Sequence, residues 1–178
     1  MKKKVLISVT ALALVICCAI GGTLAWLSTK TDPVVNTFTV GDIDIELSET
    51  PADYKMVPGN TIAKDPKVTV KSGSEACWLF IKVEESANFD DFMTYETADG
   101  WTALEGVSGV YYREISAASA NQSFSVLKGD SVAVNETVTK DQLSLAKNEN
   151  QPTLTFTAYA VQKDNISSAS DAWSKLSA

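Results

Sequence analysis

Residues 36–47, NTFTVGDIDIEL, alternate apolar and polar side chains, as expected for a β-strand with one buried face. The apolar residues take even positions up to Val40 and odd positions from Ile43 onward, so the phase changes at Gly41. A slip of one residue moves every following side chain to the opposite face of a sheet. We therefore predict a bulge or kink at Gly41 that keeps both apolar sets in the core.

The rest of the chain also consists mainly of short strand patterns. They cover residues 67–71, 76–83, 109–115, 123–127, 131–134 and 154–160. Residues 76–83, ACWLFIKV, are almost continuously apolar, which is typical of a central strand. Short strands separated by turn signals predict an all-β fold, namely an antiparallel β-sandwich of jelly-roll type with a few short helices.

The clearest turn signal is the dipeptide Asp99-Gly100, which lies between two β-prone arms. This pattern predicts a β-hairpin with its tip at these two residues. Trp101 follows the turn directly. We interpret it as a core or loop anchor, and an exposed, adhesive side chain is the alternative.

Three short helices are expected from capping patterns. Asn88 precedes the sequence FDDF and is predicted to be the N-cap of a single helical turn. Thr139 and Gln142 have the spacing of a capping box, and so do Ser168 and Asp171 near the C-terminus. Each pair predicts the start of a short helix.

The N-terminus has the three parts of a secretory signal peptide. Lysines at 2–4 form a basic region, an apolar run follows, and Ala25 and Trp26 flank the predicted cleavage site. Residues 1–25 are therefore predicted to be a signal peptide. A retained membrane anchor is the alternative, because residues 5–27 are long enough to span a bilayer. Both interpretations place the remainder of the chain outside the cytoplasm.

The charge balance restricts the partners of the protein. The 178 residues include 15 Lys and Arg against 22 Asp and Glu, a net charge of −7. Cleavage after residue 25 would remove three lysines and leave 12 basic against 22 acidic residues, a net charge of −10. Nucleic-acid binding needs a basic surface to neutralise phosphates, so this class of function is excluded.

Histidine and cysteine usage restricts the chemistry. The chain contains no histidine, which excludes a Ser-His-Asp triad, a Cys-His dyad and a His-based zinc protease motif. Two of the three cysteines lie in the signal peptide, so Cys77 has no partner for an intramolecular disulfide. Its apolar neighbours favour a buried thiol rather than a functional one.

Residues 21–49, GGTLAWLSTKTDPVVNTFTVGDIDIELSE, resemble the signature of the TasA and camelysin family of secreted Gram-positive proteins. Residues 56–70 and 158–173 also resemble members of this family. The resemblance implies a jelly-roll domain, export with a signal peptide processed by a SipW-type peptidase, and retention in the extracellular matrix or at the cell surface. TasA-like members form biofilm fibres, and the segment after their cleavage site is donated as a strand to the neighbouring subunit.

By this resemblance, residues 26–36 correspond to a donated strand or a linker, and residues 37–178 form the jelly-roll domain. The expected assembly residues are all apolar: Trp26, Leu27, Val34, Val35 and Phe38. Addition to a partner's open sheet edge would satisfy the backbone of such a segment and bury its side chains. Packing on its own domain, or fraying, is the alternative. Pro33 fits only at an edge or break of the strand.

Enzymatic function is not expected, although camelysin is a metallopeptidase. Without histidine, a zinc site would need carboxylates alone, which is unusual, so no cofactor or metal is predicted. Asp42, Asp44 and Glu46 line one face of a strand and are interpreted as a solvated face, with a calcium site as the alternative.

The sequence thus predicts a secreted structural subunit that assembles with copies of itself and with other matrix or cell-surface components. The only membrane contact expected is through an uncleaved signal segment. A monomeric adhesion or carbohydrate-binding module is the first alternative, since jelly rolls also serve as lectin folds. A camelysin-like peptidase is the second.

Overall fold

The computed structural model describes residues 42–50, 55–117, 119–146 and 150–176. These residues belong to one compact unit that spans 40–178. The predicted signal peptide, the predicted bulge at Gly41 and the proposed donor segment 26–36 lie outside the described residues. No helix within the described ranges is long and apolar enough to cross a membrane.

The described residues contain ten strands and four short helical segments. The strands are β1 (Ile45–Ser48), β2 (Thr61–Ala63), β3 (Lys67–Val70), β4 (Cys77–Glu85), β5 (Met93–Thr94), β6 (Thr102–Ala103), β7 (Val110–Ile115), β8 (Gln122–Ser125), β9 (Ser131–Val134) and β10 (Leu154–Gln162). The helical segments are α2 (Phe89–Phe92), η1 (Lys128–Asp130), α3 (Lys140–Leu145) and α4 (Ala169–Leu176). The all-β prediction with a few short helices is confirmed.

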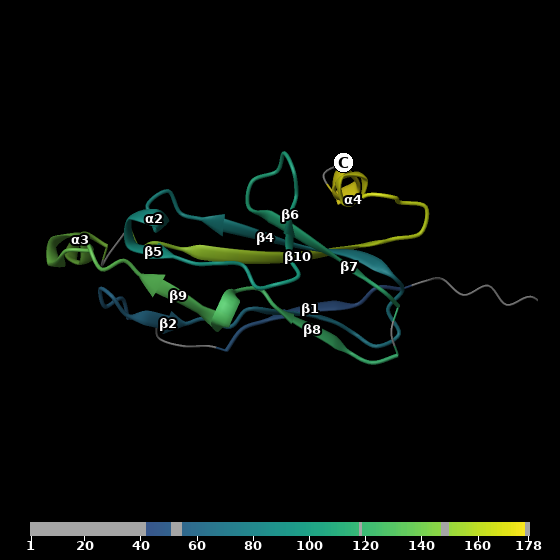
Figure 1. Cartoon of the computed structure of the whole chain (residues 1–178), viewed down its shortest axis with the longest axis horizontal. Helices are drawn as coiled ribbons and strands as arrows, with labels where there is room; N and C mark the ends of the chain where they lie inside the picture. Colours follow the sequence, from purple (N-terminus) through teal and green to yellow (C-terminus); the bar gives the residue numbers. More distant parts are fainter. Residues whose placement is uncertain (1–41, 51–54, 118, 147–149, 177–178) are drawn as a thin grey trace, which may run out of the picture. The chain divides into compact units, whose positions relative to one another are not determined.

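The strands form three sheets in which every pairing is antiparallel (Figure 1). The largest sheet has four strands in the order β10-β4-β7-β6. The two smaller sheets have three strands each, in the orders β1-β3-β8 and β2-β9-β5.

Strand β4 is the centre of the largest sheet and is buried on both faces. Its odd-numbered residues from Cys77 to Val83 belong to the main core, which also contains valines of β3 and β9. One face of the four-stranded sheet therefore packs against both smaller sheets. The even-numbered Trp78 and Phe80 point to the other face and join a second apolar cluster. This double burial explains the continuous apolar run in the sequence and confirms the central strand.

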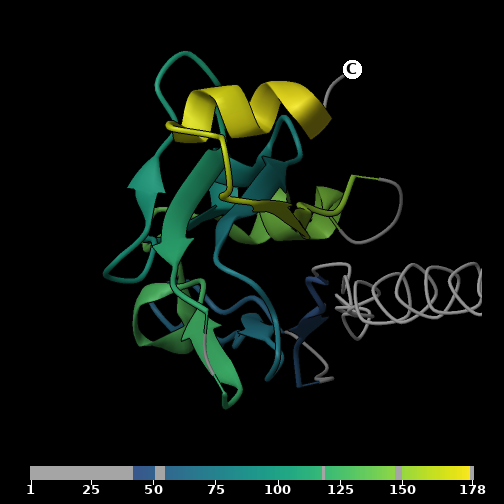
Figure 2. The ribbon, with the colours of Figure 1, turned by 90° about the vertical axis from the view of Figure 1, so that its right-hand side faces the viewer.

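Helix α4 covers the outer face of the four-stranded sheet (Figure 2). Ala169 and Ala172 are buried against this face. The Trp173 ring lies 5.2 Å from the Phe80 ring and 5.4 Å from the Tyr159 ring, measured between centroids. Aromatic pairs at these distances add to the stabilisation that their buried area gives.

All three predicted helix starts are confirmed, and two of them have the predicted capping bond. The Thr139 hydroxyl accepts from the backbone N–H of Gln142, whose side chain in turn accepts from the N–H of Thr139. The Ser168 hydroxyl likewise accepts from the N–H of Asp171 at 3.1 Å. Asn88 is the N-cap residue of the single helical turn α2, as predicted, but its side chain makes no capping bond and instead donates to the Asn150 carbonyl in the segment before β10.

The predicted hairpin at Asp99-Gly100 is wrong, although the chain does turn there. Gly100 has a φ of +87°, and a Cβ at this position would overlap the Arg113 guanidinium. The two arms belong to different sheets, since β5 pairs with β9 and β6 pairs with β7. Trp101 explains the separation: it is 9% exposed, and its indole N–H donates to the Ser125 carbonyl at 2.8 Å. Trp101 is therefore a core anchor.

Candidate functional site

The most unusual surface feature is β10, a nine-residue strand at the edge of the four-stranded sheet. Its sequence, LTFTAYAVQ, contains no charged residue, no proline and no glycine. Its register with β4 is continuous over all nine residues, so no bulge interrupts it. Sheet edges are ordinarily protected by charges, proline, bulges or short length. Strand β10 has none of these protections.

Alternate residues of β10 direct their backbone groups away from β4. The N–H of Ser86 bonds to the carbonyl of Thr153, and the N–H of Lys163 bonds to that of Ala76. In an antiparallel pair such bonded residues alternate with unbonded ones, so the odd-numbered residues of β10 bond to β4. The outward N–H and C=O groups belong to the even-numbered residues: Leu154, Phe156, Ala158, Ala160 and Gln162.

The same even-numbered residues direct their side chains toward the core. Leu154, Phe156, Ala158 and Ala160 pack against the main core, yet all four are only partly buried. A strand added outside β10 would cover them. Such a strand would therefore gain backbone hydrogen bonds and apolar contact at one site.

Strand β1, which belongs to the sheet β1-β3-β8, faces this edge. Leu47 and Pro66 on one side, with Leu154 and Phe156 on the other, line a cavity of about 360 Å³. Leu47 is 38% exposed although its register partner Val68 is fully buried. We call the region bounded by β10 on one sheet and by β1 and β2 on the others the open side.

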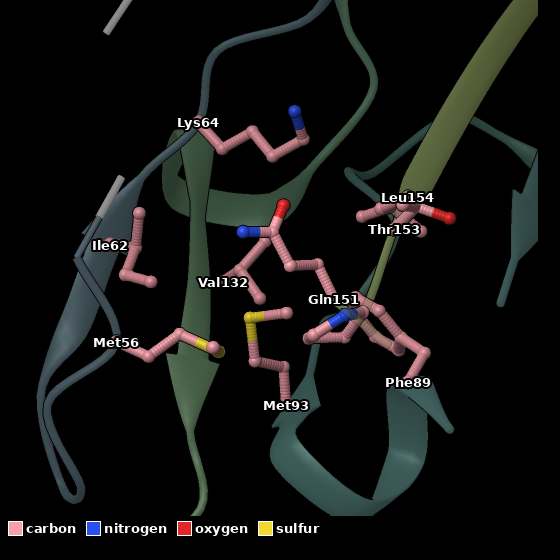
Figure 3. Close-up of a pocket in the computed structure, with 10 residues that line it drawn as sticks. Met56, Ile62, Lys64, Phe89, Met93, Val132, Gln151, Thr153 and Leu154 are labelled. Carbon is pink, nitrogen blue, oxygen red and sulfur yellow. The ribbon is translucent and has the colours of Figure 1, made fainter. Parts of the chain in front are cut away.

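A second cavity, of about 430 Å³, continues the open side toward β2 and β9. Figure 3 shows Met56, Ile62 and Val132 approaching it from one side and Leu154 from the other. Most of its lining is apolar. The polar lining groups are Lys64, Gln151 and Thr153.

One ion pair lies on the open side. The Lys64 ammonium is 2.8 Å from a Glu49 carboxylate oxygen and 5.4 Å from the centre of the Phe156 ring. The Lys64 side chain is 15% exposed, so its methylene groups also cover apolar surface. The pair adds no net charge to the site.

The opposite side of the same core is covered. The segment before Trp101 pairs through its backbone with residues 126–128, with N–H···O distances of 2.9 Å at Ala98 and at Lys128. The Arg113 guanidinium lies 5.0 Å from the Trp101 ring and 4.1 Å from the Phe124 ring. We call this region the closed side. Burial lowers the pKa of Arg113, the only arginine of the chain, below its usual value.

Two other ionisable groups are perturbed by burial. Desolvation raises the pKa of the Cys77 thiol from 9.0 to about 11, so the thiol stays protonated at neutral pH. This confirms the predicted buried cysteine. Burial, followed by a 2.7 Å hydrogen bond to Glu85, raises the pKa of Tyr95.

The predicted acidic face does not form a metal site in the part of the chain that the structure describes. Within these ranges, no three Asp, Glu, Cys or His side chains gather in a way that could hold a metal ion. Glu46 instead forms an ion pair with Lys71. The Asp44 backbone belongs to the ladder with β3, where its carbonyl accepts from the N–H of Lys71.

The residues that were predicted to form the cleavage site and the assembly strand all lie outside the described residues. These are Ala25, Trp26, Leu27, Val34, Val35 and Phe38. Sequence reasoning did not single out the β10 edge. The nine residues of β10 carry no charge, but residues 116–127 are also uncharged, so this pattern alone does not mark an edge strand.

No family model, no curated protein and no solved structure shows significant similarity to this chain.

Proposed function

We propose that this protein is a secreted structural subunit of an extracellular matrix or cell surface, and that it assembles with copies of itself by strand addition. The donor is the N-terminal segment 26–36, after cleavage of the signal peptide by a SipW-type peptidase. The acceptor is the edge of β10. The subunit is a jelly-roll β-sandwich of the TasA type without enzymatic activity or cofactor, and it also contacts other matrix or surface components.

The observation that carries this proposal is the unprotected edge of β10. Five residues of this edge direct their backbone N–H and C=O groups away from β4: Leu154, Phe156, Ala158, Ala160 and Gln162. The side chains of the first four point toward the core and are only partly buried. A strand that pairs with this edge gains about 0.5–1.5 kcal/mol for each net hydrogen bond. Covering the exposed parts of Leu154 and Phe156 adds roughly 25 cal/mol for each Å² of apolar area removed from water.

Electrostatics favour the same edge. The chain is acidic, so most of its surfaces repel a second copy. Strand β10 carries no charge, and the proposed donor 26–36 carries one lysine and one aspartate, which balance. Association through these two segments therefore brings together the parts of the protein with the least mutual repulsion.

The jelly-roll assignment is supported by the face-to-face packing of the four-stranded sheet on the two smaller sheets. It is supported also by the separation of β5 from β6, because strands that follow one another in sequence enter different sheets. Jelly rolls connect their two sheets in this manner.

A matched pair of proline variants tests the proposal. The N–H of Ala158 points away from β4, so Ala158→Pro removes a group that only an added strand would use. The N–H of Thr157 points toward β4, so Thr157→Pro removes a bond within the subunit. We expect Ala158→Pro to keep the circular dichroism spectrum and lose assembly, and Thr157→Pro to lower the unfolding midpoint.

Assembly is measured by electron microscopy and sedimentation of protein recovered from expressing cells, with its N-terminus read by intact mass spectrometry. Deletion of residues 26–36 should abolish fibres, and a synthetic peptide of this segment should bind the deleted protein but not its Ala158→Pro form. Fibres that persist both in the Ala158→Pro variant and after deletion of residues 26–36 would refute strand addition at β10. A protein that stays monomeric and binds a glycan array would indicate a binding module instead.

A further inference from the structure

Two methionines meet in the larger cavity of the open side. Apart from the initiator, Met56 and Met93 are the only methionines of the chain. Met56 precedes β2 and Met93 begins β5, so they reach the cavity from different elements. Figure 3 shows the Met56 side chain pointing from the β2 side toward Met93, which lies between β9 and the start of β10.

The cavity suits the thioether group in its reduced form. Ile62, Val132 and Leu154 supply apolar lining around the two methionines. Methionine is flexible and polarizable, so it adapts to irregular apolar partners. The cavity would therefore receive an apolar side chain of an incoming strand as part of the proposed assembly.

The same cavity is accessible to small oxidants. It is partly open to the surface, and its volume of about 430 Å³ far exceeds that of a peroxide molecule. Met56 is only partly buried, whereas Met93 is 9% exposed. Cys77, the remaining sulfur in the described residues, is fully buried. Met56 is thus the most exposed of the three sulfur-containing residues that the structure describes.

We propose that Met56 is a peroxide-sensitive modification site, and that its oxidation closes the open side to the incoming strand. In this reaction the thioether sulfur attacks one oxygen of hydrogen peroxide and the O–O bond breaks. The products are methionine sulfoxide and water. The sulfur loses two electrons and the peroxide gains them. This inference rests on the proposed function, because it concerns the regulation of the same acceptor site.

The physical reason is the polarity of the product. A sulfoxide is a strong hydrogen-bond acceptor, so it favours water over contact with Ile62 and Leu154. An apolar side chain that docks beside it would have to strip that water away without replacing its hydrogen bonds. Linkage then requires the reverse effect: a docked strand that disfavours the sulfoxide also covers Met56 and slows its oxidation.

The first experiment measures which sulfur reacts. The full chain recovered from expressing cells is treated with dilute hydrogen peroxide, and each methionine is followed by peptide mass spectrometry. We expect Met56 to oxidise about tenfold faster than Met93 in the unassembled protein, since Met56 is the more exposed residue. Within fibres the rate at Met56 should fall at least several-fold, while unfolded protein should oxidise both residues at similar rates.

The second experiment links oxidation to assembly. Peroxide-treated protein should lose fibre formation, and methionine sulfoxide reductases should restore it. Met56→Leu and Met93→Leu conserve volume and are each compared with their own untreated samples. Assembly of Met56→Leu should resist peroxide, whereas that of Met93→Leu should remain sensitive.

Three results would overturn the inference. The first is faster oxidation at Met93 than at Met56. The second is unchanged assembly after oxidation of Met56. The third is a Met56→Leu variant whose assembly is as sensitive to peroxide as that of the wild type. If the untreated protein does not assemble at all, the proposed function fails and this inference fails with it. Assembly that is normal but indifferent to peroxide overturns this inference alone.

Discussion

The two sides of the core differ in how its edge is covered. On the closed side, the Arg113 guanidinium lies 4.1 Å from Phe124 and 5.0 Å from Trp101, and backbone hydrogen bonds join the segment before Trp101 to residues 126–128. On the open side, Leu154 and Phe156 are only partly buried, and they line cavities together with residues of the facing strands and their flanking segments. The same sheets therefore form a complete edge at one side and an incomplete one at the other.

The closed side and the open side contribute differently to the stability of the subunit. The closed side supplies its own covering residues and so contributes to the stability of the single subunit. The open side leaves apolar area only partly buried and directs backbone groups of β10 away from β4, so an added strand of the proposed assembly would find both unused. Changes on the closed side should act on folding, and changes on the open side should act on assembly.

The largest effect on folding is expected for Trp101→Ala on the closed side. This change removes a buried ring, a 2.8 Å hydrogen bond to Ser125 and the stacking partner of Arg113. Large aromatic truncations in a core cost about 3–5 kcal/mol. Urea denaturation should show a loss of this size in the free energy of unfolding. A loss well below 2 kcal/mol would mean that Trp101 does not cover the closed side as described.

The core between the two sides should lose stability at high pH through Cys77. Its pKa is raised from 9.0 to about 11, so above pH 9 the unfolded chain releases the thiol proton and the folded chain keeps it. The stabilisation is complete below pH 9 and is lost as pH rises to about 11, by about 2–3 kcal/mol. Other groups also titrate there, so the measurement compares the pH dependence of unfolding in the wild type and in Cys77→Ala. Equal slopes would contradict the prediction.

A smaller effect on folding is expected for Phe156→Ala on the open side. The ring is only partly buried in the subunit, so we expect a loss of about 1–2 kcal/mol in urea denaturation, less than for Trp101→Ala. Its effect on assembly should be the greater one, since an added strand would cover the ring. If Phe156→Ala destabilised the monomer as strongly as Trp101→Ala, the distinction between the two sides would fail.

The smallest effect is expected for Glu96→Gln on the closed side. A carboxylate oxygen of Glu96 lies 2.6 Å from the Lys128 ammonium nitrogen, but the side chains of Glu96 and Lys128 are 72% and 61% exposed. The hydrogen bond to Lys128 lowers the pKa of Glu96, so any stabilisation is present at neutral pH and is lost as pH falls through the lowered pKa. Exposed pairs contribute little, and we expect no measurable change in the unfolding midpoint at pH 7. A clear decrease would show that charge pairing helps to hold the closed side.

Some parts of the fold could be predicted because the signal is local. The capping pairs at Thr139 and Ser168 satisfy N–H groups within three residues, so their effect does not depend on the rest of the chain. The continuous apolar run of β4 likewise reports burial on two faces. The position of Asn88 at the start of α2 was predicted correctly, but its capping bond is absent because the side chain donates to the distant Asn150 carbonyl instead.

The hairpin prediction failed for a tertiary reason. Asp99-Gly100 does form a turn, but the strands beside it pair with β9 and β7 and not with each other. A turn residue fixes only its own backbone angles, whereas pairing depends on which strand offers a matching edge. The candidate site was missed for the same reason, because the alternating pattern of β10 does not show whether the strand has one neighbour or two.

Composition and pattern determined the all-β class, the central position of β4, the buried thiol of Cys77 and the absence of histidine chemistry. These properties follow from the side chains themselves and from the period of a strand. Only the tertiary structure decided that β10 is an edge, that its partly buried face meets β1 and β2 across cavities, and that Met56 and Met93 share one of them. Such facts depend on contacts between segments distant in sequence, and the alternation of a single strand is the same whether its neighbour is present or missing.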